Sequence, residues 1–430
     1  MKIAVIGTGH VGLVAGACLA GTGNTVVCVD QDAATVRRLR RGALPFFEPG
    51  LEELVRRNAS EKRLSFTTQL SRAVRASPAI IIAAGAPPGE DGGADLPRVL
   101  AVAREIARSM NGYKVIVVAS TVPVGTAAKV RETVRRETTH PFSVVSAPAF
   151  LTRGAAVGDF LRPDRVVVGA EDERGAEIVR QLYAPFTRTG GPALVMDCAS
   201  AELSKHAANA FLAARISLMN EIANACEALG ADVEQVRRAI GADRRIGPSF
   251  LFPGIGYGGA FSRDIRALVR SAGDKGYQFH IPRAVERVNE AQKSVLAAKM
   301  ARHFGSLEGR TIAVWGLAFR PGTDDVRDAP SLALIDQLLS AGARIQAYDP
   351  AAMPGAKRVF GARITLAPGA HAALAGADAL ALVTEWHEFL EPDFGKMRKL
   401  MKSPVVFDGR NAYSRDTMRA HGFTYYGIGR

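Results

Sequence analysis

The first thirty residues hold the pattern that most restricts the fold of this chain. A short apolar run, KIAVIG, is followed by a helix-length apolar stretch and then by a second short run, TVVCVD. Gly7, Gly9 and Gly12 lie between the first run and the helical stretch, in G-x-G-x-x-G spacing. Glycines at this spacing permit a tight turn from a strand into a helix and a close approach to the backbone. The segment therefore predicts the first β-α-β unit of a parallel sheet.

The same segment predicts a dinucleotide site. The amino end of the helix can receive a pyrophosphate, because its first backbone N–H groups have no partner within the helix. Asp30 ends the second run, 30 − 12 = 18 residues after the last glycine. A carboxylate there can accept hydrogen bonds from a ribose and would repel a 2′-phosphate. A tight turn without a ligand is the alternative interpretation. We expect NAD, rather than NADP, to be bound by Gly7, Gly9, His10, Val11, Gly12 and Asp30.

Short apolar runs and helix-length stretches alternate along most of the chain. The alternation extends to Cys198 and resumes from Arg310. Between them, 199–230 reads as one long helix, and another helix is expected around 282–304. Alternation of this kind predicts β-α units and parallel sheets. The predicted fold class is α/β, with two Rossmann-like, doubly wound sheets joined by a long central helical segment. The expected domains are residues 1–198, 199–305 and 306–430.

The composition argues against several other classes of protein. The formal net charge is +13, from 55 basic and 42 acidic residues. The basic residues are dispersed and do not alternate with aromatic ones, so we expect no nucleic-acid partner. The longest mostly apolar stretch, 211–231, is interrupted by charged residues, so we expect no membrane span and a cytoplasmic protein. Four widely spaced cysteines in apolar segments, Cys18, Cys28, Cys198 and Cys226, favour buried free thiols over disulfides or a metal site.

Segments along the whole chain resemble one family. They include GTGHVGLVAGACLA, FFEPGLEELV, APPGEDGGADL, STVPVGT, AELSKHAANAFLAARISLMNEIAN, RRIGPSFLFPGIGYGG and GLAFRPGTDDVRDAPS. By these segments the chain is similar to the UDP-glucose 6-dehydrogenases, within the UDP-glucose/GDP-mannose dehydrogenase family of NAD-dependent enzymes. The resemblance implies an NAD-binding amino-terminal domain and a central helix that forms a homodimer. It also implies a carboxy-terminal domain that binds the UDP part of a UDP-sugar, UDP-glucose or a relative.

The reaction of the family removes two hydrides from the C6 hydroxymethyl group of the sugar. A cysteine adds to the intermediate aldehyde, the second hydride transfer leaves a thioester, and water hydrolyses the thioester. An aldehyde cannot donate a hydride until a nucleophile has added to it, and a thiolate is both a strong nucleophile and a good leaving group. A member of the family without this cysteine is therefore not expected to complete the usual four-electron oxidation.

The loop that carries the cysteine in the family is altered here. GYGGAFSRD, residues 256–264, is one residue shorter than the family's Gly-[Tyr/Phe]-Gly-Gly-x-Cys-x-Pro-Lys-Asp, and the place of the cysteine is deleted or taken by Ala260 or Phe261. In SAPAFLTRG, Ala147 and Ala149 stand where the family has an asparagine and a glutamate implicated in the thioester steps. We do not expect a serine of the loop to replace the thiol, because no histidine base is evident near it in the sequence.

Residues for one hydride transfer are retained. By resemblance, Thr121, Lys205, Asn209 and Asp264 are catalytic positions that hold a water or the sugar oxygen and support deprotonation. A lysine ammonium can stabilise the developing alkoxide, and a carboxylate can orient a water as proton acceptor. As alternatives, Lys205 and Asn209 could form an ordinary polar helix face, and Asp264 could cap the helix that follows it. We expect His206 to be a packed or solvated histidine.

The resemblance also assigns the substrate contacts and the remaining cofactor contacts. Arginine suits diphosphates because its guanidinium group can bind two oxygens at once, although ordinary surface charge is the alternative for each arginine. The expected substrate residues are Phe150, Leu151, Lys205, Asn209, Arg245 (from the neighbouring subunit), Phe250, Gly256, Tyr257, Gly258, Arg320 and Arg410. The expected further cofactor residues are Ser120, Thr121 and Arg327.

We therefore predict an NAD-dependent oxidoreductase that acts on a UDP-sugar. Because the thiol is absent from the loop, we expect a two-electron oxidation, or an oxidation followed by re-reduction as in an epimerase. One alternative is a catalytically silent nucleotide-sugar or NAD binder with a regulatory role. Another is the full oxidation of UDP-glucose to UDP-glucuronate by a route that does not need the cysteine.

Overall fold

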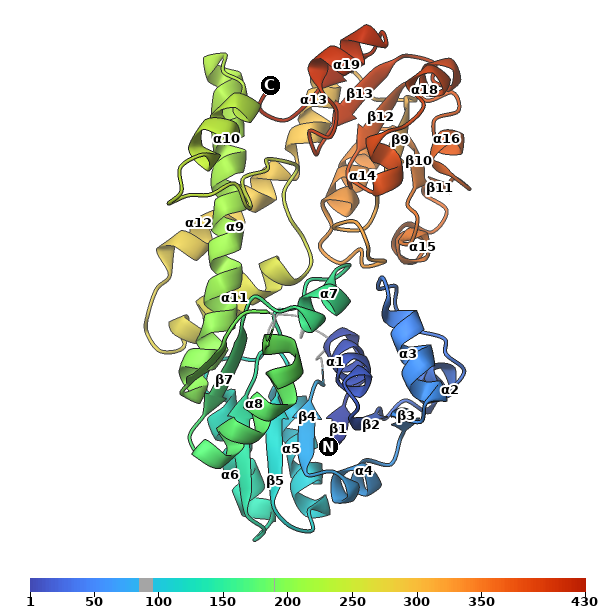
Figure 1. Cartoon of the computed structure of the whole chain (residues 1–430). Coiled ribbons are helices and arrows are strands. Elements are labelled where there is room, and N and C mark those ends of the chain that lie inside the picture. The colour runs from blue at the N-terminus through green and yellow to red at the C-terminus, as the bar shows by residue number, and fades with distance from the viewer. Residues whose placement is uncertain (85–95, 189) are drawn as a thin grey trace. The chain divides into compact units, whose positions relative to one another are not determined.

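The fold is seen in a computed structural model of the chain, which describes residues 1–84, 96–188 and 190–430 (Figure 1). The side chain of Ala260 and most of the APPGEDGGADL segment (86–96) lie outside the described residues. The described chain divides into two units, Met1–Ala208 with Arg266–Gly276 and Asn209–Ile265 with Tyr277–Arg430. This division does not test the three domain boundaries expected from the sequence, which stay a prediction.

An eight-stranded sheet forms the centre of the first unit among the described residues, with the strand order β3-β2-β1-β4-β5-β6-β7-β8. The strands are β1 (Lys2–Ile6), β2 (Thr25–Val29), β3 (Leu64–Thr67), β4 (Ala79–Ile82), β5 (Lys114–Val118), β6 (Phe142–Ser146), β7 (Val166–Ala170) and β8 (Ala193–Met196). β1 to β6 are parallel, in the order of doubly wound dinucleotide-binding sheets. The winding reverses between β1 and β4, and ligands of such sheets bind at the carboxyl ends of the strands there.

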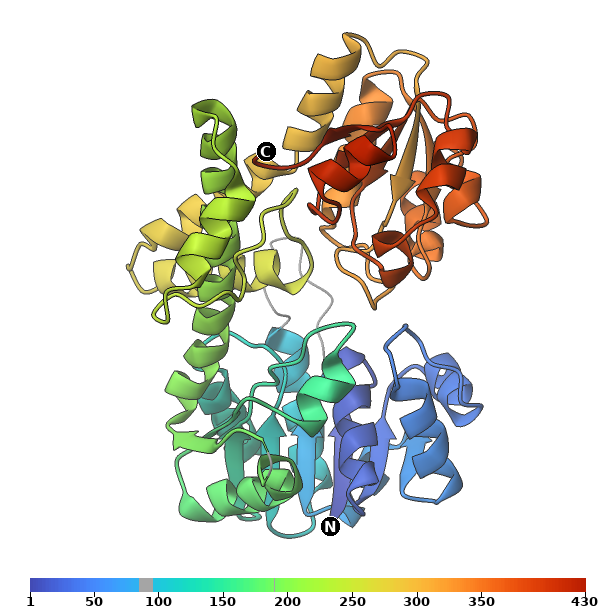
Figure 2. The ribbon, with the colours of Figure 1, turned by 45° about the horizontal axis from the view of Figure 1, so that its top comes forward.

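Helices cover both faces of this sheet (Figure 2). One core is formed with α1 (His10–Gly21), α2 (Ala33–Arg40), α3 (Leu51–Ser60), α7 (Ala156–Leu161) and α8 (Glu173–Thr187), and the other with α4 (Leu70–Ala76), α5 (Leu96–Ser109) and α6 (Thr126–Glu137). Ile3 and Val5 of β1 belong to the first core, whereas Ala4 and Ile6 belong to the second. The central strands β1 and β4 are buried on both faces, and apart from Lys2 at the start of β1 their sequences are apolar.

The last two strands of this sheet depart from the expected parallel arrangement. β7 pairs antiparallel with β6, and β8 pairs parallel with β7. The connection between β6 and β7, residues 147–165, contains one helix, the six-residue α7. A parallel neighbour needs a connection that crosses back over the sheet. The chain here re-enters the sheet from the edge at which β6 ended.

The long helix expected after Cys198 is confirmed. α9 extends over Cys198–Leu229, and the boundary between the two units falls within it, after Ala208. The single helix expected around 282–304 is instead two helices, α12 (His280–Gln292) and α13 (Val295–Phe304). Ser294 N bonds the carbonyl oxygen of Ala291, three residues back, so the last turn of α12 tightens and ends there. The other helices of this part are α10 (Val233–Gly241) and α11 (Ala260–Gly273).

A six-stranded parallel sheet forms the centre of the second unit among the described residues, in the order β11-β10-β9-β12-β13-β14. Its strands are β9 (Thr311–Trp315), β10 (Arg344–Tyr348), β11 (Thr365–Leu366), β12 (Ala379–Leu382), β13 (Val405–Asp408) and β14 (Thr424–Tyr426). Its helices are α14 (Pro330–Ser340), α15 (Met353–Phe360), α16 (Ala370–Ala373), α17 (His387–Leu390), α18 (Phe394–Leu400) and α19 (Arg415–Ala420). The predicted fold class, with two doubly wound sheets and a long central helical segment, is confirmed.

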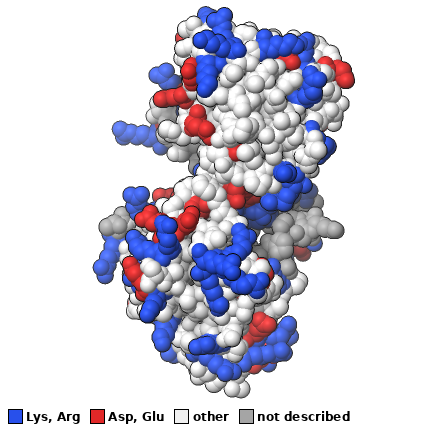
Figure 3. Space-filling view, turned by 90° about the vertical axis from the view of Figure 1, so that its right-hand side faces the viewer, with Lys and Arg blue, Asp and Glu red and all other residues white. Residues whose placement is uncertain are grey.

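The charged side chains on one face of the molecule and the four cysteines can be compared with what the sequence predicts. On the face shown in Figure 3, lysine and arginine side chains form separate groups among acidic and uncharged ones. All four cysteines are buried free thiols, as expected, and burial raises the pKa of both Cys18 and Cys28 to about 12. No helix among the described residues has the length and apolar character needed to span a membrane.

Candidate functional site

Two of the three glycines in the turn between β1 and α1 are required by the fold itself. Gly7 has a positive φ of 107°, and a Cβ atom there would lie 2.6 Å from the carbonyl oxygen of Ala83. A Cβ atom at Gly12 would lie 2.1 Å from the carbonyl oxygen of Gly7. At Gly9, by contrast, a Cβ atom would meet nothing within 4 Å. This open space, beside the first N–H groups of α1, fits a bound pyrophosphate.

Asp30 lies beside this turn, at the end of β2. The hydroxyl of Thr8 donates to Asp30 Oδ2 at 2.5 Å, and Thr8 N donates to the same oxygen at 3.1 Å. Asp32 N donates to Asp30 Oδ1 at 3.0 Å. A carboxylate offers about four acceptor positions, so Oδ1 keeps one for a ribose hydroxyl. Sequence reasoning missed Thr8, although its position between the first two glycines is a usable signal.

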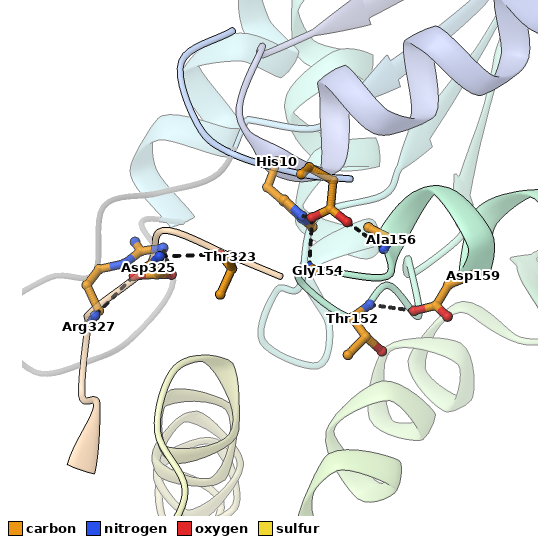
Figure 4. Close-up of polar contacts among 9 residues, drawn as sticks. His10, Thr152, Gly154, Ala156, Asp159, Thr323, Asp325 and Arg327 are labelled. Carbon is orange, nitrogen blue, oxygen red and sulfur yellow. Dashed lines mark hydrogen bonds and ion pairs between the residues drawn. The ribbon is translucent and has the colours of Figure 1, made fainter. Parts of the chain in front are cut away.

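His10, the first residue of α1, is held by a buried glutamate. His10 Nε2 lies 2.7 Å from Glu48 Oε2. Glu48 also accepts hydrogen bonds from Gly154 N at 2.9 Å and from Ala156 N at 2.8 Å. Figure 4 draws each of these two bonds as a dashed line that ends at the labelled Gly154 or Ala156. Sequence reasoning missed Glu48. It belongs to the segment FFEPGLEELV, but its partners are 38, 106 and 108 residues away, so the segment alone does not indicate these contacts.

The expected cofactor residues Ser120 and Thr121 lie in the loop after β5. Ser120 Oγ donates to the carbonyl oxygens of Ile82 at 3.4 Å and Ala84 at 3.2 Å. These bonds tie the loop to the carboxyl end of β4. Thr121 is half-buried in the same loop. Both residues therefore lie at the edge where doubly wound sheets bind ligands.

Two side chains of α9 hold the rest of this loop. His206 Nε2 lies 2.8 Å from the carbonyl oxygen of Val122, and His206 is buried, so the expectation of a packed histidine is confirmed. Glu202 accepts hydrogen bonds from Gly125 N at 2.6 Å and from Ala127 N at 2.7 Å, at the start of α6. Burial raises the pKa of the Glu202 carboxyl, and these hydrogen bonds offset only part of that effect.

The structure brings together two predicted substrate residues of the first unit, Lys205 and Phe150. Lys205 Nζ lies 5.1 Å from the centroid of the Phe150 ring, within the range of a cation–π contact. Arg165 Cζ lies 3.7 Å from the same centroid. Lys205 is buried, with 8 % of its surface exposed. The neighbouring Leu151 packs against the first core.

Asn209 and Asp264 form the central polar contact of the second unit. Asn209 Nδ2 donates to Asp264 Oδ2 at 2.5 Å, and both side chains are buried. Arg263 Nε lies 3.6 Å from Asp264 Oδ1. Lys205 precedes Asn209 by one turn of α9. Three of the four predicted catalytic residues therefore belong to α9 and to the start of α11.

The alternative that Asp264 caps a helix is wrong. α11 begins at Ala260, so Asp264 lies inside the helix and its carboxylate faces Asn209 instead of the free N–H groups of a helix end. The glycines before Ala260 end the loop, and the helix starts one turn earlier than the charged residues suggest. Ser262, also in α11, is buried, and its Oγ has no hydrogen-bond partner among the described residues.

The loop of residues 250–258 contacts Arg410 in the second unit. Arg410 Nε donates to the carbonyl oxygen of Val383 at 2.7 Å and lies 3.2 Å from Glu385 Oε2. Arg410 Nη1 reaches the carbonyl oxygen of Gly256 at 3.5 Å. A Cβ atom at Gly258 would lie 2.2 Å from the carbonyl oxygen of Asp328, so only glycine fits there. The guanidinium group is thus held at the carboxyl ends of β12 and β13.

Three amide side chains that sequence reasoning missed hold this loop. Asn289 Oδ1 accepts from Tyr257 N at 2.8 Å, and Asn289 Nδ2 donates to the carbonyl oxygen of Tyr257 at 3.1 Å. Asn220 Oδ1 accepts from Gly254 N at 2.8 Å, and Gln292 Nε2 donates to the Gly254 carbonyl oxygen at 2.7 Å. All three residues are buried; Asn220 belongs to α9, and Asn289 and Gln292 belong to α12. Their role depends on long-range contacts, which a single sequence does not display.

Three more arginines were predicted to bind the cofactor or the substrate, and the contacts of these arginines do not by themselves define a site. Arg327 forms a double hydrogen bond with Asp325, from Nε to Oδ1 at 2.8 Å and from Nη2 to Oδ2 at 2.7 Å (Figure 4), and the pairing raises the pKa of Arg327. Arg320 is half-buried in the loop after β9. The Arg245 side chain is 89 % exposed and pairs with Asp243. A single chain does not test its expected role in a neighbouring subunit.

The glycine turn, Asp30 and the strand order define a dinucleotide-binding α/β protein with a second doubly wound sheet. The chain belongs to the UDP-glucose/GDP-mannose dehydrogenase family. The NAD binding domain of the family matches residues 1–187, its central domain matches 199–291, and its UDP binding domain matches 313–415. The expectations of an NAD cofactor and of an oxidoreductase of this family are confirmed, and the third match supports a UDP-binding carboxy-terminal part.

Individual relatives agree with this assignment over the full chain. The UDP-glucose 6-dehydrogenase of Pseudomonas aeruginosa is 49 % identical over 442 residues, covering 100 % of this chain and 98 % of the relative. The UDP-glucose 6-dehydrogenase TuaD of Bacillus subtilis is 45 % identical over 432 residues, covering 100 % and 93 %. Among solved structures, the UDP-glucose dehydrogenase of Pyrobaculum islandicum is similar with a TM-score of 0.91 and 38 % identity, covering 100 % of this chain and 97 % of that chain.

Proposed function

We propose that the protein oxidises a UDP-sugar, UDP-glucose or a relative, by two electrons, or oxidises and re-reduces it as an epimerase does. The observation that carries the proposal is the make-up of the loop GYGGAFSRD. It keeps Asp264, in contact with Asn209 at 2.5 Å, but it contains no thiol. All four cysteines are buried in other parts of the chain.

Asp264, Asn209, Lys205 and Thr121 are the proposed catalytic residues. Asp264 Oδ1 lies 3.6 Å from Arg263 Nε, which is beyond a normal hydrogen bond. That oxygen can accept a hydrogen bond from a water, and the water takes the proton of the sugar hydroxyl. The ammonium of Lys205 stabilises the alkoxide that develops. The cofactor site would supply the hydride acceptor, NAD, so that oxidation of the same carbon would leave a carbonyl.

A second oxidation would need a nucleophile that adds to this carbonyl. The place of the cysteine is deleted or taken by Ala260 or Phe261. The Phe261 ring packs against Tyr257, with ring centroids 5.7 Å apart, and its centroid lies 6.5 Å from that of Phe250. Ser262 Oγ is buried without a partner in the described part of the chain, so no base prepares it for attack. An unassisted alkoxide in a buried position is costly to form. The reaction therefore stops after two electrons.

The remaining roles follow the family resemblance. The proposed substrate contacts are Phe150, Leu151, Lys205, Asn209, Phe250, Gly256, Tyr257, Gly258, Arg320 and Arg410, with Arg245 from a second subunit of a homodimer. The proposed cofactor contacts are Gly7, Gly9, His10, Val11, Gly12, Asp30, Ser120, Thr121 and Arg327. Arg410 donates hydrogen bonds to the carbonyl oxygens of Val383 and Gly256, which fixes its guanidinium group. This supports a role for Arg410 in binding the diphosphate. We also propose the domain division 1–198, 199–305 and 306–430.

The test is a count of NADH formed per UDP-glucose consumed, with the product mass measured in the same sample. One NADH per sugar, or none with an altered sugar, supports the proposal. Two NADH and the mass of a carboxylate contradict it and indicate a route without the cysteine. If UDP-glucose and NAD bind without isotope exchange at any sugar carbon, the protein is instead a silent binder. An Asp264→Asn variant, expected to bind both ligands without turnover, controls for contaminating activity.

A further inference from the structure

Glu48 is a buried acidic residue outside the proposed catalytic machinery. It is 3 % exposed, and both of its carboxylate oxygens are engaged. Oε2 accepts from His10 Nε2 at 2.7 Å and from Gly154 N at 2.9 Å, and Oε1 accepts from Ala156 N at 2.8 Å. A buried carboxylate without such donors would be strongly unfavourable. With three partners on one buried carboxyl group, Glu48 joins the segments to which these partners belong and fixes their relative position.

The first partner of Glu48 belongs to the dinucleotide turn. His10 begins α1 and directly follows Gly9, where the backbone leaves open space. An ionised carboxylate can only accept, so His10 Nε2 carries the hydrogen of this contact when Glu48 is ionised. The ring also lies 5.3 Å from the Phe46 ring, and only 7 % of the His10 side chain is exposed. A ring held in this way fixes the backbone of the turn at the point where α1 starts.

The other two partners belong to the turn that follows Leu151, a proposed substrate residue. Gly154 and Ala156 lie at the start of α7. Thr152 N donates to Asp159 Oδ2 at 2.7 Å (Figure 4), and Ala155 N donates to the carbonyl oxygen of Thr152 at 2.9 Å. These bonds close the turn on itself. The bonds to Glu48 are the ones that join the turn to the start of α1.

We propose that Glu48 is a positioning residue that holds the dinucleotide turn and the 152–156 turn in one arrangement, so that binding of NAD depends on it. The cofactor part of the proposal needs only the NAD site. A further part, that UDP-sugar affinity falls as well, rests on the proposed function, because it depends on the assignment of Leu151 to the substrate.

The experiment measures the dissociation constant of NADH by fluorescence titration for the wild type, Glu48→Gln, His10→Phe, the double variant and a control variant. Glu48→Gln keeps the size of the side chain but turns an NH2 group towards at least one of three donors. We expect its NADH dissociation constant to rise by about 10-fold or more, as for the loss of a hydrogen bond to a charged group. His10→Phe should raise the dissociation constant by a similar factor. The double variant should bind NADH no more weakly than the single variant that has the larger dissociation constant.

Asn58→Ser is the matched control. Asn58 is buried on α3 and donates to the carbonyl oxygens of Ala17 at 3.1 Å and Leu54 at 2.9 Å, so it joins α3 to α1 at a point away from His10. It should lower the melting temperature and leave the NADH dissociation constant within about 2-fold of the wild type. If Glu48→Gln fails to fold, Glu48→Asp and His10→Phe test the proposal in its place. Glu48→Asp keeps the negative charge, so we expect it to bind NADH more tightly than His10→Phe does.

Two results would overturn the proposal. One is unchanged NADH affinity in a folded Glu48→Gln or His10→Phe variant, and the other is fully additive losses in the double variant. UDP-glucose titrations run in parallel separate this outcome from the proposed function. If the wild type does not bind UDP-glucose, the proposed function fails, while the NADH titrations still decide the role of Glu48.

Discussion

Asn209 Nδ2 donates to Asp264 Oδ2 at 2.5 Å, although the two residues are 55 positions apart in the sequence. Both side chains are buried. Because the amide nitrogen is the donor, Asp264 Oδ2 is the acceptor of this contact. The contact fixes a carboxylate in the loop GYGGAFSRD, a segment that lacks a thiol, and the proposed function assigns proton transfer to this carboxylate.

Asp264→Asn is expected to lower kcat by about 100-fold to 10,000-fold, the usual contribution of a general base. The amide keeps the size of the side chain but cannot take up a proton through a water. NADH binding should be unchanged. Asp172→Asn is the control, because it makes the same chemical change at the N-cap of α8, where Asp172 accepts from Gly175 N at 2.7 Å and asparagine caps about as well as aspartate. Its turnover should match that of the wild type. Wild-type turnover in Asp264→Asn would show that another group takes the proton.

Alkylation of cysteines is expected to leave the activity unchanged. All four thiols are buried, and burial raises the pKa of Cys18 and Cys28 to about 12 and also raises that of Cys198. Thiolate, the reactive form, is therefore scarce at neutral pH. Treatment of the native protein with iodoacetamide should add little mass over the time of an assay, and the rate of NADH formation should persist. Loss of activity in step with one added carbamidomethyl group would instead indicate an essential thiol.

The sequence predicts those parts of the fold and site that depend on neighbouring residues. Gly7, Gly9 and Gly12 with Asp30 predict the first β-α-β unit, because tight turns and buried parallel strands have local requirements. The long α9 follows from helical periodicity over more than thirty residues. The antiparallel β7 was not predicted, since its direction depends on the path of the chain around α7.

The contacts that hold the site in place could not be predicted from the sequence. Glu48 meets His10 and Ala156 across 38 and 108 residues, and Asn289 meets Tyr257 across 32. Such polar residues look like surface residues in a sequence, because only the folded chain shows that they are buried. Asp264 was expected either as a base or as a helix cap, and the start of α11 at Ala260 removes the second interpretation.

The stability contribution of Glu202 is expected to fall as pH rises. Burial raises the pKa of this carboxyl in the folded chain above its ordinary value. Between the ordinary and the raised pKa, the folded chain binds more protons than the unfolded chain. The free energy of unfolding then decreases with pH, by at most about 1.4 kcal/mol per pH unit for one group. Below this window the group is protonated in both states, and above it the loss is complete.

Glu202→Gln tests this sign. The variant loses one acceptor for Gly125 N or Ala127 N at every pH, but it no longer titrates. Urea unfolding from about pH 4 to about pH 8 should show the variant gaining stability relative to the wild type as pH rises through the window. Asp172→Asn, measured in the same series, controls for loss of a capping carboxylate in the same unit. A constant difference between Glu202→Gln and the wild type would contradict the raised pKa.

Gly9→Ala and Gly12→Ala should separate cofactor binding from folding. At Gly12 a Cβ atom would lie 2.1 Å from the carbonyl oxygen of Gly7, and overpacking of this kind typically costs about 1 to 3 kcal/mol. We expect Gly12→Ala to unfold at a lower temperature. Gly9 has φ −70°, which alanine adopts readily, and a Cβ atom there meets nothing within 4 Å. Gly9→Ala should therefore keep most of its stability, with a cost below about 1 kcal/mol at this cap position.

The methyl group at residue 9 would nevertheless occupy the space proposed for the pyrophosphate. We expect Gly9→Ala to raise the NADH dissociation constant by about 10-fold or more, since a close backbone approach is lost. Thermal unfolding and NADH titration of the two variants together check this. If Gly9→Ala binds NADH as the wild type does, the pyrophosphate lies away from this turn, and Glu48 then has no route through His10 to the cofactor. Because the two glycines differ in what surrounds them, a loss of affinity without a loss of stability identifies Gly9 as a binding position and Gly12 as a folding one.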